Sequence, residues 1–218
     1  MDRLLELFTP AIIDTFYMVF FSSLFATLLG LPLGILAVIT SKGHILEMPK
    51  LKTILDLFIN VFRSFPFIIL MILVFPLSRF IVGTTIGSTA TIVPLSIAAA
   101  PFVARLIEGA IKEVDGGLIE LSKSLGANNW EIIFKVLIPE AMPSLIHSFT
   151  ITIISLIGYS AMAGAIGGGG LGDLAIRYGY QRFQTDIMII SVVVIIIIVQ
   201  VIQAIGDLIV KNIKKNRK

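Results

Sequence analysis

The fold of this chain is decided by residues 120–139, which read ELSKSLGANNWEIIFKVLIP. They form the only long, strongly polar interval between apolar segments that are otherwise nearly continuous. Leucines and aromatic residues recur in it at helical spacing, and Gly126 interrupts them. Glycine commonly stops a helix, and Asn128 or Asn129 can cap a new one. The interval is therefore predicted to hold a short helix, a glycine turn and a second short helix that ends at Pro139.

The composition around this interval is that of a membrane protein. Of the 218 residues, 56% are hydrophobic and 14% are charged, and the mean hydropathy is +0.99. A soluble domain carries about a quarter charged residues. A soluble core of this size cannot hide so much apolar surface, so lipid must be the solvent for much of it. No polar block is long enough for a second domain, so we expect one membrane domain over residues 1–218.

Five stretches are long and apolar enough to cross a membrane, since a spanning helix needs about 20 largely apolar residues. They run over residues 15–40, 54–75, 89–111, 145–165 and 187–210. The sequence therefore predicts an all-α membrane protein with five transmembrane helices. The polar interval, at about residues 112–139, falls between the third and fourth of them.

The basic residues predict the orientation, because cytoplasmic loops of membrane proteins are enriched in lysine and arginine. The tail from Lys211 to Lys218 is strongly basic and is interpreted as a cytoplasmic membrane anchor. The other basic residues on that side are Lys42, Lys50, Lys52, Lys112, Lys123 and Lys135, and those on the opposite side are Arg3, Arg79, Arg177 and Arg182. We therefore expect a multi-pass protein with its N-terminus outside and its C-terminus in the cytoplasm.

Proline and glycine predict where the spans bend and where they approach one another. The first span contains GLPLG at residues 30–34, in which proline bends the helix and two glycines four apart allow another helix to come close. This motif is either a packing kink or a hinge that moves during function. The third span has Pro94 and Pro101 around three alanines, which also favours a bent helix in tight contact.

Charged residues inside membrane segments mark candidate functional positions. Arg63 in the second span could snorkel to water, pair with Asp56 or belong to a transport pathway. In the third span, Arg105 and Glu108 are three residues apart on one helical face, and we expect them to pair.

One face of the fourth span carries four residues at helical spacing: Thr152, Ser155, Tyr159 and Met162. Hydroxyls in membrane helices often bond to backbone carbonyls, so this face has a structural interpretation. The alternative is that it lines a translocation path. Met162 would then lie at the outer end, where a soft, unbranched side chain could contribute to a gate.

The polar interval resembles the cytoplasmic motif of the membrane subunits of bacterial binding-protein-dependent, ATP-driven importers. That motif reads Glu-Ala-Ala, three residues, Gly, nine residues, then Ile-x-Leu-Pro. Here Glu120, Gly126 and Pro139 fall in register, Leu121 and Ser122 replace the two alanines, and the last four residues are VLIP. Further segments are similar to the methionine-uptake branch of that family, whose members are short and carry five spans. They are GLPLG at 30–34, RSFPFI at 63–68, IGYSAM at 157–162 and GGLG at 169–172.

The resemblance implies a fold, a location and partners. The fold is that of a type I ABC importer permease in the bacterial inner membrane. The partners are a second copy of this chain, two cytoplasmic ATP-binding subunits and an extracytoplasmic substrate-binding protein. The resemblance also implies that residues 112–139, from here on the coupling segment, dock on the ATPase. The residues implied in docking are Glu120, Leu121, Leu125, Gly126 and Pro139.

Several other functions find no support in the sequence. The absence of cysteine excludes disulfides and thiol chemistry, and His44 and His147 make no metal-ligand pattern. The glycine run at 167–172 has neither the preceding strand nor the Gly-Lys-Ser/Thr ending of a phosphate loop. We expect it to be flexible or tightly turned near the outer mouth. We also expect no catalytic residues, metal, cofactor or nucleic-acid partner, with ATP bound by a separate subunit.

Two other classes of function stay open at this point. A self-sufficient secondary transporter or channel would also need several apolar spans, but ion-coupled carriers usually hold ionisable groups near the bilayer midplane. Here Asp56, Glu108 and Asp207 lie near span ends. A scaffold subunit would explain the apolar spans but not the polar face of the fourth. Transport in proteoliposomes discriminates among them. The substrate is expected to be a small zwitterion, and methionine follows from the resemblance alone.

Overall fold

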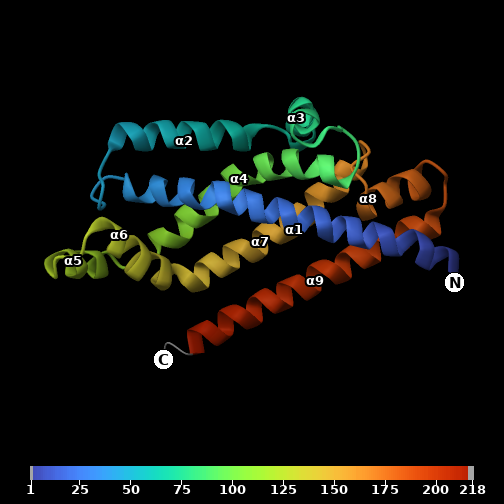
Figure 1. Ribbon diagram of the computed structural model, residues 1–218. Helices are drawn as coiled ribbons and strands as arrows, with labels where there is room; N and C mark the ends of the chain where they lie inside the picture. Colours follow the sequence, from blue (N-terminus) through green and yellow to red (C-terminus); the bar gives the residue numbers. More distant parts are fainter. Residues whose placement is uncertain (1, 216–218) are drawn as a thin grey trace.

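The computed structural model describes residues 2–215, and within that range every regular element is a helix. The four longest helices are α1 (Asp2–Ile39), α4 (Ser88–Lys112), α7 (Ile138–Gly164) and α9 (Thr185–Lys215). Two of intermediate length, α2 (Pro49–Ser64) and α3 (Phe67–Val82), lie on one side of the bundle (Figure 1). The short elements are α5 (Gly116–Ser124), α6 (Asn129–Glu131), the π-helix η1 (Ile132–Leu137), α8 (Gly170–Leu174) and the π-helix η2 (Ala175–Tyr180).

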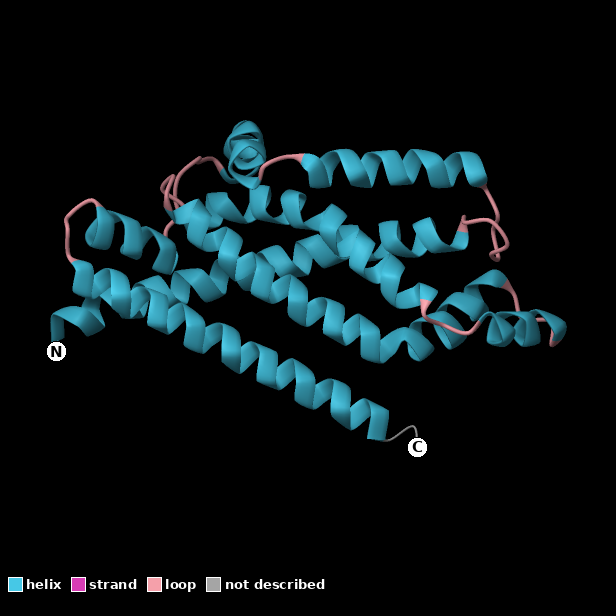
Figure 2. Ribbon diagram, turned by 180° about the vertical axis from the view of Figure 1, so that it is seen from behind, coloured by secondary structure: helices cyan, strands magenta, loops and turns pink. Residues whose placement is uncertain are grey.

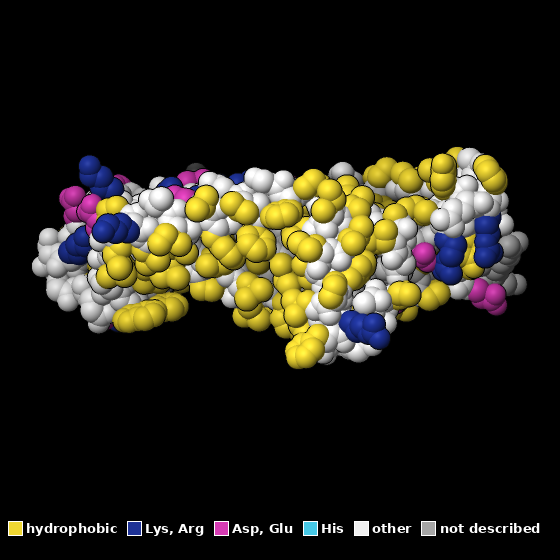
Figure 3. Space-filling model, turned by 90° about the horizontal axis from the view of Figure 1, so that it is seen from above, with side chains coloured by type: hydrophobic (Ala, Val, Ile, Leu, Met, Phe, Trp, Pro, Cys, Tyr) yellow, Lys and Arg dark blue, Asp and Glu magenta, His cyan; other side chains and the backbone are white. Residues whose placement is uncertain are grey.

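The long helices have the dimensions of membrane spans. Four helical segments in the described part of the chain are long and apolar enough to cross a bilayer, and α2 with α3 makes a fifth if the bent pair is one span. Apolar side chains cover the middle of the surface in Figure 3, and most charged side chains there lie near the two ends of the molecule. The predicted all-α membrane fold is thus confirmed.

The second predicted span, residues 54–75, is wrong as a continuous helix. It is broken after Ser64, and the chain bends by 104° between α2 and α3. Phe65 adopts an extended conformation with φ −69° and ψ 132°. The cause is Pro66, because the proline ring clashes with the residue before it in the α conformation. The apolar run extends across the break, which is why hydropathy alone does not reveal it.

Helices α1 and α4 are in close contact along a stripe of small residues. A β-carbon on Gly30 would lie 2.7 Å from the carbonyl oxygen of Ala100, and one on Gly34 would lie 2.7 Å from that of Ala104. Only glycine therefore permits this approach. We call the contact of Gly30 and Gly34 with residues 100–107 the α1–α4 seam. The predicted packing role of the two glycines is confirmed.

The main core forms around this seam. It joins buried side chains of α1, α4, η1 and α7, such as Val38, Leu95, Ile107, Leu137 and Leu156. Helix α9 lies against α7, but most of its apolar side chains remain exposed. In a membrane chain such a surface faces lipid or another subunit.

The two chain ends lie at opposite ends of the bundle (Figures 1 and 2). The coupling segment, the α1–α2 loop and the end of α9 gather at one end, and the start of α1, α8 and η2 at the other. This arrangement agrees with an odd number of crossings. Of the predicted basic tail, the structure describes Lys211, Lys214 and Lys215 at the end of α9, whereas residues 216–218 lie outside the described residues.

The glycine run at 167–172 is tightly turned and packed. The carbonyl oxygen of Gly167 accepts a hydrogen bond of 2.9 Å from the backbone N–H of Gly87. The backbone N–H of Leu171 donates to the hydroxyl of Thr15 on α1, also at 2.9 Å. A β-carbon on Gly172 would collide with the backbone of Ala161 on α7. The run leads into α8 and η2, two short helices between the fourth and fifth predicted spans.

Candidate coupling segment and translocation path

Helix α5 begins and ends at recognisable signals. Its N-cap is Asp115, whose carboxylate accepts a 2.8 Å hydrogen bond from the backbone N–H of Gly117. Its last residue is Ser124, its C-cap is Leu125, and the next residue, Gly126, has a φ of +83°. The N–H groups of Gly126 and Ala127 donate to carbonyls of Lys123 and Ser122, each at 3.0 Å, which is the pattern of a Schellman C-cap. The predicted glycine turn is confirmed.

The next helix starts with a capping box at Asn128 and Glu131. The backbone N–H of Glu131 donates to the Asn128 side chain at 2.9 Å, and the backbone N–H of Asn128 donates to the Glu131 carboxylate at 3.1 Å. Lys135 donates to the same carboxylate at 2.9 Å. The hydrogen bond from Lys135 and that from the Asn128 backbone lower the pKa of Glu131. These contacts give the turn between α5 and α6 a defined geometry.

The prediction that this second helix ends at Pro139 is wrong. Residues 129–164 form one continuous helical segment, in which α6 leads through η1 into α7. Proline in a regular α-helix removes a hydrogen bond and crowds the preceding turn. Here the wider π-helical turn over Ile132–Leu137 comes just before it and accommodates the ring. The coupling segment is therefore a direct extension of a membrane helix.

The coupling segment has a buried side and an exposed side. Ile132, Ile133 and Leu137 belong to the main core and fasten the segment to the bundle. On the exposed side, Leu125 and Trp130 are 79% and 70% accessible. The other large apolar side chains exposed there are Leu118, Leu121 and Phe134, and Phe134 stacks on Trp130 at 5.8 Å. An ordered scaffold thus presents apolar side chains at the polar end of the molecule, as a docking surface would.

All five residues that the resemblance implies in docking are exposed: Glu120, Leu121, Leu125, Gly126 and Pro139. The structure brings the first four together on α5 and its C-cap, and Pro139 lies at the start of α7. Trp130 and Phe134 were singled out in sequence only by their spacing, and the structure adds them as the exposed aromatic part of the surface.

An ion-pair network joins α2 to α4 close to the coupling segment. The Glu108 carboxylate, with a side chain only 4% exposed, accepts hydrogen bonds of 2.8 Å from both Lys52 and Lys112. It also pairs with Arg105, as the spacing predicts. Arg105 reaches Asp56 on α2 at 2.8 Å. We call Lys52, Asp56, Arg105, Glu108 and Lys112 the inner ion network.

The inner ion network decides one alternative for Arg63. Asp56 pairs with Lys52 and Arg105, so its predicted pairing with Arg63 is wrong. Arg63 lies instead in the last turn of α2, at the break before α3. There it lines a cavity of about 260 Å³ together with Tyr159 of the predicted path. The second pair in the network, Lys52 and Glu108, comes from positions 56 residues apart and has no local signal.

The four residues on the predicted path face of α7 differ in exposure. Thr152 is buried, and its hydroxyl donates to the carbonyl of Ser148 at 2.8 Å, which matches the structural interpretation of that hydroxyl. Ser155 and Tyr159 are half-buried, and the Tyr159 ring stacks on Phe67 of α3 at 4.5 Å. Met162 is 47% exposed near the end of α7. Their role in a path stays a prediction.

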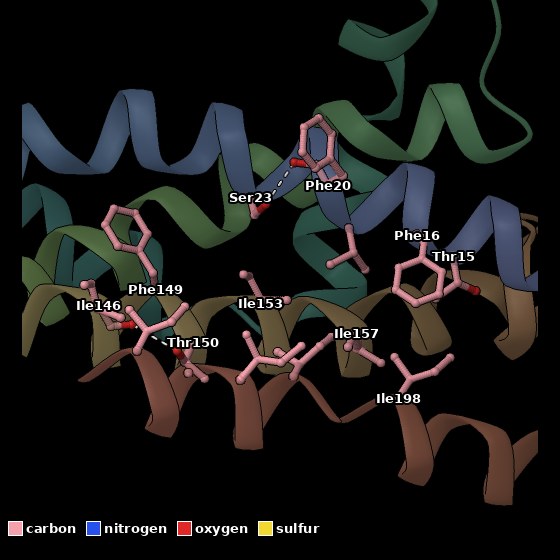
Figure 4. A pocket seen from close by; sticks show the side chains of 15 residues that line it. Thr15, Phe16, Phe20, Ser23, Ile146, Phe149, Thr150, Ile153, Ile157 and Ile198 are labelled. Carbon is pink, nitrogen blue, oxygen red and sulfur yellow. Dashed lines mark hydrogen bonds between the residues drawn. The ribbon is translucent and has the colours of Figure 1, made fainter. Parts of the chain in front are cut away.

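A second cavity, of about 350 Å³, lies between α1, α7 and α9 (Figure 4). Its walls are almost entirely apolar, and the hydroxyl groups that line it already donate hydrogen bonds within the protein. Thr15 donates to Ala11, Ser23 to Phe20 and Thr150 to Ile146, all to backbone carbonyls. The α7 residues that line it, such as Ile146 and Ile153, lie on the side of the helix away from Ser155 and Met162. This cavity therefore has the character of a lipid-facing wedge.

The two histidines lie on different elements and differ in burial. His44 lies in the α1–α2 loop, where burial and the nearby Lys123 lower its pKa. His147 is exposed on α7. Within residues 2–215 no group of three or more His, Cys, Asp or Glu side chains could hold a metal ion.

The bundle of apolar helices, one broken span and an ordered apolar surface at the polar end are the features of a multi-pass membrane protein with a surface suited to docking. The chain belongs to the family described as "Binding-protein-dependent transport system inner membrane component", which matches residues 30–218. Its fold is that of a type I ABC importer permease, and the resemblance drawn from the sequence is confirmed.

Individual relatives are highly similar over most of the chain. The protein named "Probable D-methionine transport system permease protein MetI" of Pasteurella multocida is 50% identical over 205 residues, which cover 94% of each chain. The "Methionine import system permease protein MetP" of Bacillus subtilis is 49% identical over 177 residues, covering 81% of this chain and 80% of the relative. A chain of the MetNI methionine ABC transporter in an inward-facing conformation superposes with a TM-score of 0.96 at 44% identity, covering 98% and 99% of the two chains.

Proposed function

We propose that this chain is the permease subunit of an ATP-driven methionine importer. The family supports an importer permease, and the names of relatives up to 50% identical support methionine as the substrate. The observation that carries the proposal is the exposed apolar surface of the coupling segment. Leu121, Leu125 and Trp130 are held on an ordered scaffold that is continuous with α7.

In this proposal the chain itself binds no ATP and catalyses no reaction. Two separate ATP-binding subunits dock on the coupling segments of a homodimer, and a substrate-binding protein delivers the substrate from outside. Apolar side chains such as Leu125 and Trp130 supply the docking energy, and the charged ones select the partner. The arrangement of the termini at opposite ends supports the predicted topology in a bacterial inner membrane, with the coupling segment and the end of α9 in the cytoplasm.

Movement of the ATPases would reach the membrane by two routes. The first is direct, because α6 and η1 continue into α7 without interruption. The second runs from α5 to α4, whose last turn holds Lys112, and through the inner ion network to α2. Both routes lead to the residues proposed for the path, namely Arg63, Thr152, Ser155, Tyr159 and the gate residue Met162.

The test is co-purification followed by transport. Trp130→Ala should reduce the amount of ATPase subunit that co-purifies by about tenfold or more, because large aromatic anchors dominate such interfaces. The matched control is Phe80→Ala, since Phe80 is an aromatic residue on α3 that is 88% exposed and lies far from the coupling segment in the chain. In proteoliposomes with the ATPase and the binding protein, methionine uptake should require ATP hydrolysis.

Two outcomes would contradict the proposal. Uptake driven by an ion gradient without ATPase subunits would make the chain a secondary transporter or channel. An absence of flux under every condition would make it a scaffold. Retention of the ATPase by Trp130→Ala and by a Leu121→Asp, Leu125→Asp double variant would show that the docking surface lies elsewhere.

A further inference from the structure

The break between α2 and α3 opens a cavity whose lining is unlike that of the lipid-facing wedge. Four elements meet there, namely the end of α2, the start of α3, the middle of α4 and the outer half of α7. Its walls hold one cation, Arg63, and several aromatic rings. The rings are those of Phe62, Phe65, Phe67, Phe102 and Tyr159. A guanidinium surrounded by aromatic rings is a combination suited to a ligand with one anionic group and one apolar part.

Arg63 carries a charge at the break in the second span without a protein counterion. Within residues 4–215 no carboxylate lies within ion-pairing distance of it, whereas Arg105 and Arg177 are both paired. Arg63 is an exposed residue in the last turn of α2, immediately before the break. An ionisable group in a membrane segment is rare unless it faces a pathway, reaches water or pairs with another group.

The start of α3 adds a second feature that favours an anion. Phe67, the first residue of α3, lines the cavity, and no side chain caps the helix at Pro66. Half-helices of broken spans in transporters direct such N-termini, which carry a partial positive charge, toward the anionic group of a substrate. The break therefore sets both an uncapped helix N-terminus and a guanidinium at one cavity.

The aromatic walls suit a flexible apolar side chain. Tyr159 and Phe67 are stacked with their ring centroids 4.5 Å apart and their planes within 10°. A thioether makes favourable contacts at aromatic ring edges, and an unbranched chain can fill an irregular space. The phenol oxygen of Tyr159 can accept a hydrogen bond from an ammonium group. The volume of about 260 Å³ leaves room for one such small molecule.

We propose that this cavity is a binding site, within the permease itself, for a free amino acid with a long, unbranched apolar side chain. The carboxylate of the amino acid pairs with Arg63, and its side chain lies among the rings of Phe62, Phe67 and Phe102. This inference rests on the proposed function. It adds a selective step inside the membrane to the selection made by the binding protein outside.

Direct binding tests the chemistry of the site. The complex of permease and ATPase is placed in nanodiscs without the binding protein, and the binding of three probes is measured. Methionine and norleucine, which share the carboxylate and the unbranched chain, should bind. Methioninol lacks the carboxylate and should bind about tenfold or more weakly, as expected for the loss of hydrogen bonds to a charged group. Equal binding of methionine and methioninol would overturn the proposal.

Transport by variants tests the role of Arg63. Arg63→Gln should lower ATP-driven methionine uptake about tenfold or more, whereas Arg63→Lys should keep a substantial part of it because the charge remains. The control is Arg79→Gln, because Arg79 is an exposed arginine on α3 that does not line the cavity. Its uptake should match that of the unaltered chain.

The two proposals fail in different ways. If the unaltered complex shows ATP-driven uptake and Arg63→Gln transports equally well, the site is wrong and the proposed function stands. If the unaltered complex shows no ATP-driven uptake, the proposed function is wrong. The discrimination between methionine and methioninol in nanodiscs then decides the site by itself, since that measurement needs no transport.

Discussion

Glycine has opposite roles in two regions of this molecule, the α1–α4 seam and the coupling segment. At Gly34 the missing side chain is what matters, because a β-carbon would lie 2.7 Å from the carbonyl oxygen of Ala104. At Gly126 nothing lies within 4 Å of that position, and the backbone angle is what matters, since its φ is +83°. One glycine therefore brings two helices together, and the other allows a turn in open space.

The same contrast holds for apolar side chains. Around the seam they are buried, and their contribution is to the stability of the bundle. On the coupling segment, side chains such as Leu125 and Trp130 are exposed in isolation and add little stability there. In the proposed function they become buried against the ATPase. Substitutions at the α1–α4 seam are therefore expected to destabilise the fold. Substitutions on the coupling segment are expected to weaken the proposed docking of the ATPase and leave the fold intact.

The largest effect is expected at the inner ion network, which connects the two regions. Glu108→Gln leaves Lys52, Arg105 and Lys112 close together without the buried carboxylate that they share. Removing one partner of a buried ion pair costs about 3–5 kcal/mol, so the free energy of unfolding should fall by that amount. The measurement is an unfolding titration with dodecyl sulfate in mixed micelles.

The control for this prediction is Glu131→Gln on the coupling segment. Glu131 is at the surface, and glutamine can also complete a capping box, so the variant should unfold like the unaltered chain. If both variants lose the same stability, the inner ion network is not a structural link between α2 and α4.

The next effect concerns the seam itself. Gly34→Ala forces a methyl group against the backbone of α4 and should lower the free energy of unfolding by about 1–3 kcal/mol, as overpacking does. Gly109→Ala is the matched control, because Gly109 is also in a long helix but has nothing within 4 Å of a β-carbon. The unfolding titration with dodecyl sulfate compares the stabilities of the two variants. Equal stabilities would mean that α1 and α4 can separate without loss.

A smaller, local effect is expected at the glycine turn. Gly126→Ala places a β-carbon on a residue with positive φ, at a cost of about 1 kcal/mol. The amide hydrogens of α5 should exchange faster, and the affinity for the ATPase should fall about fivefold. Gly116→Ala in the first turn of the same helix, where φ is not positive, should leave both unchanged. Unaltered exchange in Gly126→Ala would show that the turn does not need glycine.

The smallest effect is expected at the proposed gate. Met162→Gly should leave the fold and the ATPase docking intact but allow a slow leak of methionine from loaded proteoliposomes without ATP. Met188→Gly on α9 is the control, because it removes a methionine of similar exposure. A membrane as tight with Met162→Gly as with the control would remove Met162 from the gate.

Local signals in the sequence predict much of this structure. The positions of α4 and α9, the Gly126 stop, the Asn128 cap and the Arg105–Glu108 pair all follow from residues within one or two helical turns of each other. Two prolines were misinterpreted, in opposite ways. Pro66 breaks the second span inside an apolar run that predicts a continuous helix. Pro139 predicts the end of a helix, but the segment continues into α7 because a π-helical turn accommodates the proline.

By itself, the sequence determined that the chain lies in a membrane, which long segments are helical and that one polar segment holds short helices separated by a glycine turn. These properties follow from hydropathy, periodicity and capping, which depend on neighbours along the chain. Only the tertiary structure decided which side chains meet, such as Lys52 with Glu108, Gly34 with Ala104, and Arg63 with Tyr159 at one cavity. The physical reason is that packing and ion pairing depend on distances in space, and a 104° break or a glycine contact sets these distances between residues far apart in sequence.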